Sequence, residues 1–430
     1  MKKIFLTLIL ILFFSANANA LTLSDALNET YKNNTELNAE RENIKASIED
    51  INISKADYMP SVTLSGSKSY ENTNTLENQD GSGASISDVN PLTTSIKLEQ
   101  TLIDKVRDIE HSKNIIGLDL AKAKLLKKEQ DILHSAIDAF TALILAREKL
   151  SINRRNLNLL IKQVETDKVR LDRGQITTAD LSQSESSLAG AQAQFTQAKS
   201  ELMIGKLNYE NIIGRLSDAN KLKKSAKSIV SVPNSLEKAV ELSKKNDPDI
   251  KIARLELYKS EKDLSISEAD LNPTASISLE RSYTDDLSAT YSEREKDTLK
   301  ASLSWPFYSG GKKRSKINKN SNLIYKNRLL LENAIKTSNK NVGIAWSSLE
   351  SSKSFLNSVK SQVRAAKIAN EGIAAEYQRG SRTTLDVIQS NSILLTAEIS
   401  LVNSQRNYLM AQYNLLKSIG LLNSSHLKLK

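Results

Sequence analysis

The sequence has 430 residues, no cysteine and a formal net charge of +10 at pH 7. The absence of cysteine excludes disulfide bonds and the lipid-modified cysteine of a bacterial lipoprotein. Aromatic residues make up 5% of the chain and no nucleic-acid-binding motif is present, so nucleic acid is not an expected partner. We interpret the dispersed Lys and Arg residues as solvated helix surface, with a contact to anionic lipid or an acidic partner as the alternative.

Residues 1–20 predict a secretory signal peptide. Two lysines precede an apolar run over residues 4–14, and Ala18-Asn19-Ala20 supplies a small-residue cleavage site. The chain is therefore expected to be exported. No later apolar run approaches the roughly 18 residues of a membrane-spanning helix, so any crossing of a bilayer is expected to use strands closed into a barrel.

The first half of the mature chain predicts a helix, a pair of strands and a second, longer helix. The first helix covers about residues 24–58 and is ended by Pro60. Apolar residues then alternate over 62–66 and again over 96–102, which is typical of strands with one apolar face. The long helix follows over about residues 104–172.

Apolar residues recur every seven positions along this long helix. A sustained period of seven predicts helices that wind around their neighbours with a left-handed supercoil. At 1.5 Å per residue, roughly 69 helical residues span about 100 Å. The recurring residues are Ala136, Leu143, Leu150, Leu157, Val164 and Leu171. The same period returns on the later long helix at Val342, Leu349, Leu356 and Val363. Beyond the long helices it continues through Leu181, Leu188, Phe195, Leu202 and Tyr209, and through Val387, Leu394, Leu401, Tyr408 and Leu415.

The stretch from Arg173 to Asp180 predicts a tight turn between two helices. Gly174 provides the left-handed backbone that ends the first helix, and Thr177 with Asp180 forms a capping pattern for the second. The same pattern returns 206 residues later, from Arg379 to Asp386. Over 42 ungapped positions this offset gives 13 identities, which indicates a tandem duplication.

The second half repeats the order of elements found in the first. The connection between the two strands is longer in the first half, by roughly eight residues. These extra residues lie in the polar loop 71–91. We therefore divide the mature chain into a first repeat (21–214), a linker (215–234) and a second repeat (235–430). The expected elements of the second repeat are a helix over about 235–271, strands over 275–279 and 299–305, and a long helix over about 312–378.

These elements predict an α+β membrane protein that works as an oligomer. Four strands cannot close a barrel, and open sheet edges are not tolerated in lipid. Three copies would provide 12 strands, an even number within the usual range of outer-membrane barrels. The expected assembly is a homotrimeric 12-stranded transmembrane β-barrel that continues into a long coiled-coil helical barrel, with the linker packed around its middle.

Two segments at the expected spacing resemble the TolC family of outer-membrane efflux channels. One runs from Leu303 to Gly311 after the fourth strand, and the other from Tyr377 to Val387 around the second turn. The resemblance covers essentially all of the mature chain. It implies a homotrimeric channel-tunnel in the outer membrane of a Gram-negative bacterium that extends into the periplasm. It also implies a periplasmic adaptor (membrane fusion) protein and an inner-membrane pump or ABC transporter as partners.

The resemblance further implies a gate at the periplasmic turns. In the family, a Tyr and an Arg near the second turn bond to an Asp after the first turn, and the matching residues are Tyr377, Arg382 and Asp180. Family members can also carry two acidic residues on the helix after the second turn. Asp386 matches the first of these, but Gln389 replaces the second, so strong cation preference is not expected.

Two further groups of residues are predicted to be functional. In the family, adaptor hairpins dock at the turns, which here contain Arg173, Gly174, Arg379 and Gly380. An interfacial anchor is expected where the fourth strand leaves the bilayer, and packing at the junction between barrel and helices is the alternative. The residues of this strand-to-helix junction are Trp305, Pro306, Gly310 and Gly311.

The sequence predicts no enzyme. The three histidines are scattered, so no metal site or other cofactor is expected, and no catalytic constellation is present. The leading prediction is a passive exit duct of a tripartite efflux pump or a type I secretion system. The alternative is a periplasmic coiled-coil adaptor or scaffold that forms no pore. Drugs, metals, polysaccharide and secreted proteins remain alternative cargoes.

Overall fold

The computed structural model describes residues 21–83, 88–216, 218–225 and 228–429, so the predicted signal peptide lies outside the described residues. The chain divides into two compact units. The described residues of the helical unit lie within Met1–Asn38, Lys128–Asp247 and Ser338–Lys430, and those of the sheet unit lie within Ala39–Lys127 and Pro248–Thr337. Each unit therefore takes segments from both sequence repeats.

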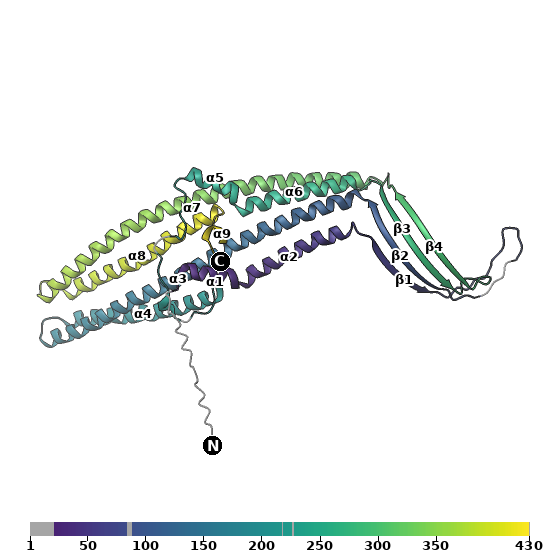
Figure 1. Ribbon diagram of the computed structural model, residues 1–430. Coiled ribbons are helices and arrows are strands. Elements are labelled where there is room, and N and C mark those ends of the chain that lie inside the picture. Colours follow the sequence, from purple (N-terminus) through teal and green to yellow (C-terminus); the bar gives the residue numbers. More distant parts are fainter. Residues whose placement is uncertain (1–20, 84–87, 217, 226–227, 430) are drawn as a thin grey trace, which may run out of the picture. The chain divides into compact units, whose positions relative to one another are not determined.

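The sheet unit contains a four-stranded antiparallel sheet in the order β1-β2-β3-β4 (Figure 1). The strands are β1 (Ser61–Lys68), β2 (Leu92–Ile103), β3 (Thr274–Asp285) and β4 (Glu293–Ser304). All four predicted strands are confirmed, and each is longer than its alternating apolar segment. The register places Val62 opposite Leu98, Leu98 opposite Leu279 and Leu279 opposite Leu299, which makes an apolar row across the sheet.

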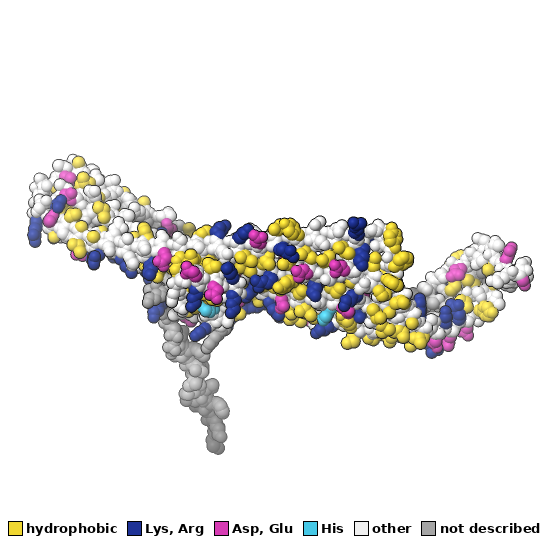
Figure 2. Space-filling model, turned by 90° about the horizontal axis from the view of Figure 1, so that it is seen from above, with side chains coloured by type: hydrophobic (Ala, Val, Ile, Leu, Met, Phe, Trp, Pro, Cys, Tyr) yellow, Lys and Arg dark blue, Asp and Glu magenta, His cyan; other side chains and the backbone are white. Residues whose placement is uncertain are grey.

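The two faces of this sheet differ in polarity and in exposure. On the apolar face, Leu279 is 53% exposed and Leu299 is 72% exposed, whereas Ser278 and Thr284 on the polar face are 9% and 4% exposed. A water-soluble sheet covers its apolar face and leaves its polar face open. The sheet has the opposite arrangement, which fits an apolar surrounding. Figure 2 shows that acidic and basic side chains also gather over the strands.

The helices at the start of each repeat are interrupted, so the prediction of single helices over 24–58 and 235–271 is wrong. The first is split into α1 (Leu23–Asn33) and α2 (Thr35–Ala56) because Asn34 leaves the helical conformation, with ψ 123°. Its side chain then accepts a hydrogen bond from the Leu37 amide. The second is split into α5 (Leu236–Asn246) and α6 (Pro248–Ala269), because proline at the first position of α6 cannot continue the preceding helix.

The long helices are confirmed as α3 (Lys105–Asp172) and α7 (Lys312–Gln378), which contribute to both units. In the helical unit, α3 is followed by α4 (Thr178–Ile212) and α7 by α8 (Thr384–Ser418), so the chain forms two helical hairpins. Two short helices complete the unit, the 3-10 helix η1 (Ala219–Lys221) and α9 (Ser424–Leu427). The predicted seven-residue positions Ala136, Leu143, Val342 and Leu349 are buried, as coiled-coil packing requires.

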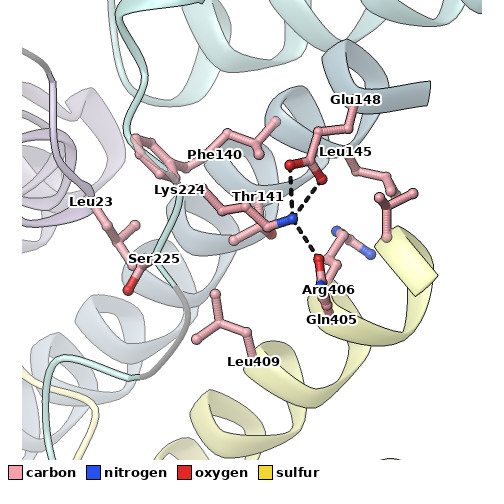
Figure 3. Close-up of a pocket in the computed structure, with 12 residues that line it drawn as sticks. Leu23, Phe140, Thr141, Leu145, Glu148, Lys224, Ser225, Gln405, Arg406 and Leu409 are labelled. Carbon is pink, nitrogen blue, oxygen red and sulfur yellow. Dashed lines mark hydrogen bonds and ion pairs between the residues drawn. The ribbon is translucent and has the colours of Figure 1, made fainter. Parts of the chain in front are cut away.

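The described residues of the linker contact α3 and α8 within the helical unit. The Arg147 guanidinium on α3 donates hydrogen bonds to the carbonyl oxygens of Ala219, Asn220 and Leu222, at 2.8–3.1 Å. Beside it, the Lys224 ammonium lies 2.7 Å from both carboxylate oxygens of Glu148 and 2.6 Å from the Gln405 amide oxygen. Figure 3 shows this ammonium among the residues that line a small cavity. The volume of the cavity is about 30 Å³.

Among the described residues, α8 alone has the length and composition of a membrane-spanning helix. This differs from the expectation that no segment after residues 1–20 has such a length and composition. Val387, Ala397 and Leu415 of this helix are buried inside the helical unit. We therefore assign α8 to the coiled-coil packing that its seven-residue pattern predicts.

Candidate functional site at the helical tips

Both predicted turns are present at the ends of the hairpins. Gly174 and Gly380 have φ angles of +67° and +82°, the left-handed region in which glycine is favoured. After α7, the Gly380 amide donates to the Tyr377 carbonyl and the Ser381 amide to the Glu376 carbonyl, which is a Schellman ending. The turn after α3 has the same pattern. The predicted turn residues Arg173, Gly174, Arg379 and Gly380 are all exposed.

Asp180 and Asp386 close matching capping boxes at the starts of α4 and α8. The Asp180 carboxylate accepts hydrogen bonds from the Thr177 amide (2.9 Å) and hydroxyl (2.8 Å), and Asp386 accepts the same pair from Thr383 at 3.0 and 2.8 Å. These bonds, the backbone one above all, hold the pKa of each carboxyl below its ordinary value. The helix-capping role that the sequence predicts for Asp180 and Asp386 is confirmed.

The capping boxes predict an acid-sensitive contribution to stability. Because the folded-state pKa of each carboxyl is lowered, the caps stabilise the protein above about pH 4 and lose this effect as the pH falls through the lowered pKa. We expect Asp386→Ala to have a lower melting temperature than wild type at pH 6, and the difference to shrink toward pH 3. Thermal unfolding at both pH values tests this, and a difference that is constant with pH would contradict it.

The three predicted gate residues surround one hollow of about 540 Å³ at the tips of the two hairpins. Asp180, Tyr377 and Arg382 all line it, together with the turn residue Arg379. They do not bond to one another within this chain. Arg382 instead forms an ion pair with Glu376 on α7, with Nε 2.7 Å from the carboxylate, and this bond raises the pKa of the guanidinium.

Tyr377 is anchored by a residue that the sequence reasoning missed. Its hydroxyl donates to the carboxylate of Asp167 on α3 at 2.5 Å, and both side chains are buried. Burial first, and then this hydrogen bond, raises the pKa of Tyr377, so the hydroxyl keeps its proton at neutral pH. The Arg170 guanidinium stacks 4.1 Å from the centre of the Tyr377 ring and donates to the Tyr377 carbonyl at 3.0 Å.

Asp167 also joins α4 to α3. Its carboxylate accepts hydrogen bonds from the Ser184 hydroxyl on α4 (2.5 Å) and from the Gln163 amide on its own helix (3.0 and 3.1 Å). One fully buried carboxylate thus connects three helices at the base of the tips. The available signal in the sequence was an acidic residue three positions after Val164, on the inward side of a seven-residue apolar pattern.

Asp386 and Gln389 share one side of α8. They are three residues apart, a spacing that places side chains on the same helix face. Gln389 is exposed and Asp386 half-buried, whereas Val387, Ser390 and Asn391 between and beside them are buried. The pair therefore points away from the contact between α7 and α8, and its place at a constriction stays a prediction.

The strand-to-helix junction follows β4 directly. Trp305 is 67% exposed, and the next aromatic side chains, Phe307 and Tyr308, are also exposed. Gly310 and Gly311 have φ angles of +59° and +81° and lead into α7. Pro306 has no amide hydrogen and lies just past the last strand residue. The junction has the exposed aromatics of an interfacial anchor, and that role stays a prediction.

The described part of the chain contains no group of three or more His, Asp or Glu side chains able to hold a metal ion. Two of the three histidines have hydrogen-bond partners on other helices, since a ring nitrogen of His111 lies 2.7 Å from the Ser54 hydroxyl and one of His134 lies 2.5 Å from the Asn414 amide oxygen. The absence of a metal site and of a cofactor therefore stays an expectation.

Comparison with known proteins gives consistent matches over most of the chain. BepC, an outer membrane efflux protein of Brucella suis, is 24% identical over 414 residues, which cover 95% of this chain and 87% of BepC. The outer membrane protein TolC of Escherichia coli is 22% identical over 436 residues, covering 96% of this chain and 85% of TolC.

A solved structure shares the fold. The outer membrane protein VceC of Vibrio cholerae superposes with a TM-score of 0.78 at 16% identity, covering 93% of this chain and 96% of VceC. The pattern of the family described as "Outer membrane efflux protein" matches residues 26–215 and 239–421, which is most of both repeats. The chain belongs to the outer membrane efflux protein family.

Proposed function

We propose that three copies of this chain form a channel-tunnel that serves as the passive exit duct of a tripartite efflux pump or a type I secretion system. As a member of its family, the protein lies in the outer membrane and extends into the periplasm. In the proposed trimer, the three sheets join into a 12-stranded barrel and the helical hairpins surround a tunnel.

The exposed apolar face of the sheet is the observation that carries this proposal. Its leucines are 40–80% exposed in the described chain, and β1 and β4 each have one unpaired edge. Lipid would cover the face, and neighbouring copies would pair the edges, since open edges are not tolerated in a bilayer. A monomer leaves both requirements unmet.

Exposed apolar side chains in the helical unit support association as well. Met203, Ile204 and Leu207 on α4 are 54–57% exposed, and Phe355 and Ile368 on α7 are 57% and 66% exposed. On helices with a seven-residue apolar pattern, such residues fit contacts with further helices. Helices from neighbouring copies would provide these contacts in a tubular trimer.

The exposed turns suit partner binding. We assign Arg173, Gly174, Arg379 and Gly380 to contacts with a periplasmic adaptor, which would join the channel to an inner-membrane pump or ABC transporter. In this assignment the adaptor and pump select the cargo.

The hollow at the tips is the proposed gate. Arg382 ties the start of α8 back to the end of α7 through Glu376, while Tyr377 and Asp180 line the same hollow. We expect Arg382→Ser to raise single-channel conductance in planar bilayers by about twofold or more, because the second tip loses its ion pair at the constriction. Arg379→Ser, at the neighbouring exposed arginine, is the control. Equal conductance of Arg382→Ser, Arg379→Ser and wild type would remove Arg382 from the gate.

A periplasmic adaptor or scaffold is the competing function. It accounts for the helices, but it leaves the apolar face of the sheet without lipid. Fractionation of cell envelopes separates the two functions, since the channel should remain with outer membranes and migrate as a heat-modifiable oligomer. Recovery with inner membranes, or release into the periplasm, would favour the adaptor.

A further inference from the structure

The two faces of β4 carry opposite charges. Successive strand residues point to opposite faces. The acidic residues Glu293, Glu295 and Asp297 share the face of Leu299, whereas Arg294, Lys296 and Lys300 share the face of the strand's Ser and Thr residues. Within the described chain, none of these three basic side chains forms an ion pair, and all three are exposed.

The rest of the polar face does not neutralise this charge. On β2, Lys97 forms an ion pair with Glu99 at 2.7 Å, and Glu280 lies opposite Lys97 on β3. These three side chains together carry a single negative charge. The remaining positions of the polar face on β1, β2 and β3 are Ser and Thr. A net positive charge therefore remains, and it is concentrated on β4.

Closure of a ring would not neutralise it either. In the proposed trimer β4 pairs with β1 of the next copy, because these are the two free edges. The polar face of β1 consists of Ser61, Thr63, Ser65 and Ser67, which carry no charge. Three copies would thus place nine basic side chains on the inner surface, from Arg294, Lys296 and Lys300 of each copy. Because β2 and β3 of each copy contribute one net negative charge, the strands would give this surface a net charge of +6.

We propose that the inner surface of the barrel is a basic lining that favours the passage of anionic solutes. This inference rests on the proposed function, because the polar face becomes the inner surface only when the apolar face meets lipid. Like charges that line a narrow aqueous path raise the local concentration of the opposite ion. Rings of Arg and Lys give anion preference in other pores. The lining would therefore select anions within the β-barrel, apart from any constriction at the tips.

Reversal potentials in a KCl gradient test the proposal, with chloride as the probe anion. We expect the double variant Lys296→Gln/Lys300→Gln to increase the permeability ratio of potassium to chloride by about twofold or more. Arg281→Gln is the control on the opposite face, and it removes one positive charge where the double variant removes two. It also removes a positive charge from the sheet, but Arg281 lies on the apolar face, where it is paired with Glu295 at 3.2 Å. Its reversal potential should equal that of wild type.

The outcomes separate this inference from the proposed function. If wild type forms no ion-conducting pore, the proposed function fails. If a pore forms and the double variant keeps the wild-type permeability ratio, or Arg281→Gln changes it equally, the basic lining is overturned.

A thiol measurement checks the orientation independently of charge. Because the chain has no cysteine, Thr298→Cys and Leu299→Cys each introduce a unique thiol, on the polar and the apolar face respectively. A membrane-impermeant thiol reagent should reduce the current of Thr298→Cys and leave Leu299→Cys unchanged. The reverse result would place the basic residues against lipid and end the proposal.

Discussion

Replacing Asp167 with alanine should loosen both hairpin tips. The Asp167 carboxylate accepts hydrogen bonds from Tyr377, Ser184 and Gln163 inside the helical unit. Asp167 is 0% exposed. Alanine would leave buried donors without a partner, each at a cost of about 1–3 kcal/mol. We expect a total loss of about 3–5 kcal/mol, in the range for a broken buried charged network. In bilayers, the variant should show more frequent openings.

The pair of Asp167 and Tyr377 can be tested by a double-mutant cycle. Tyr377→Phe removes the hydrogen bond to Asp167 and the longer one, 3.4 Å, between the Tyr377 and Thr384 hydroxyls. It keeps the ring against Arg170 and leaves the Asp167 carboxylate its other partners, so it should cost less than Asp167→Ala. The combined variant should be less destabilised than the sum of the two, with a coupling energy of about 1–3 kcal/mol. Glu165→Ala, at an exposed acid on the same helix, is the control. Effects of Asp167→Ala that match Glu165→Ala would show that Asp167 does not anchor Tyr377.

Replacing Gly420 with alanine should be the most damaging single methyl addition among the glycines. Gly420 has a φ of +76°, and an added Cβ would overlap the Asn246 carbonyl group and lie 2.8 Å from the Asp247 nitrogen. These are backbone atoms between α5 and α6, so they cannot rotate away. We expect a loss of about 4 kcal/mol or more, from strain and overlap together. The measurement is the yield and heat-dissociation temperature of the extracted oligomer.

Two other glycines separate overlap from backbone strain. Gly380 has a similar φ of +82° with nothing within 4 Å of an added Cβ, so Gly380→Ala should cost only about 1–2 kcal/mol. Gly214 matches Gly420 in the first repeat, but there the Cβ would meet the end of the Glu29 side chain, which can move. Gly214→Ala should therefore lie between the two. If Gly420→Ala is as stable as Gly380→Ala, the close packing at Gly420 is not present in solution.

The periodic parts of the fold could be predicted from the sequence. The seven-residue pattern located α3 and α7, the alternation located four strands, and the Gly and Thr-x-x-Asp patterns located both turns. Each of these signals is local and repeated. The break at Asn34 was missed because asparagine is tolerated inside helices, and its capping bond to Leu37 becomes visible only in three dimensions.

The candidate site was predictable only in part. The family resemblance pointed to Tyr377, Arg382 and Asp180, and the structure gathers them around one hollow. The partner of Tyr377 lies 210 residues away in the sequence. The seven-residue pattern predicts buried positions from apolar residues alone. Asp167 is acidic, so the pattern does not identify it as buried. The acidic and basic residues of β4 could be assigned to opposite faces of the sheet only once the strand register was known.

We expect this chain to be stable only as part of a membrane-embedded trimer. The most direct test is the molar mass of the protein purified from outer membranes, measured by light scattering with the detergent contribution subtracted. A trimer would appear as a single species with three times the mass of the chain, and it should aggregate when detergent is removed. A uniform monomer that stays dissolved without detergent would contradict it.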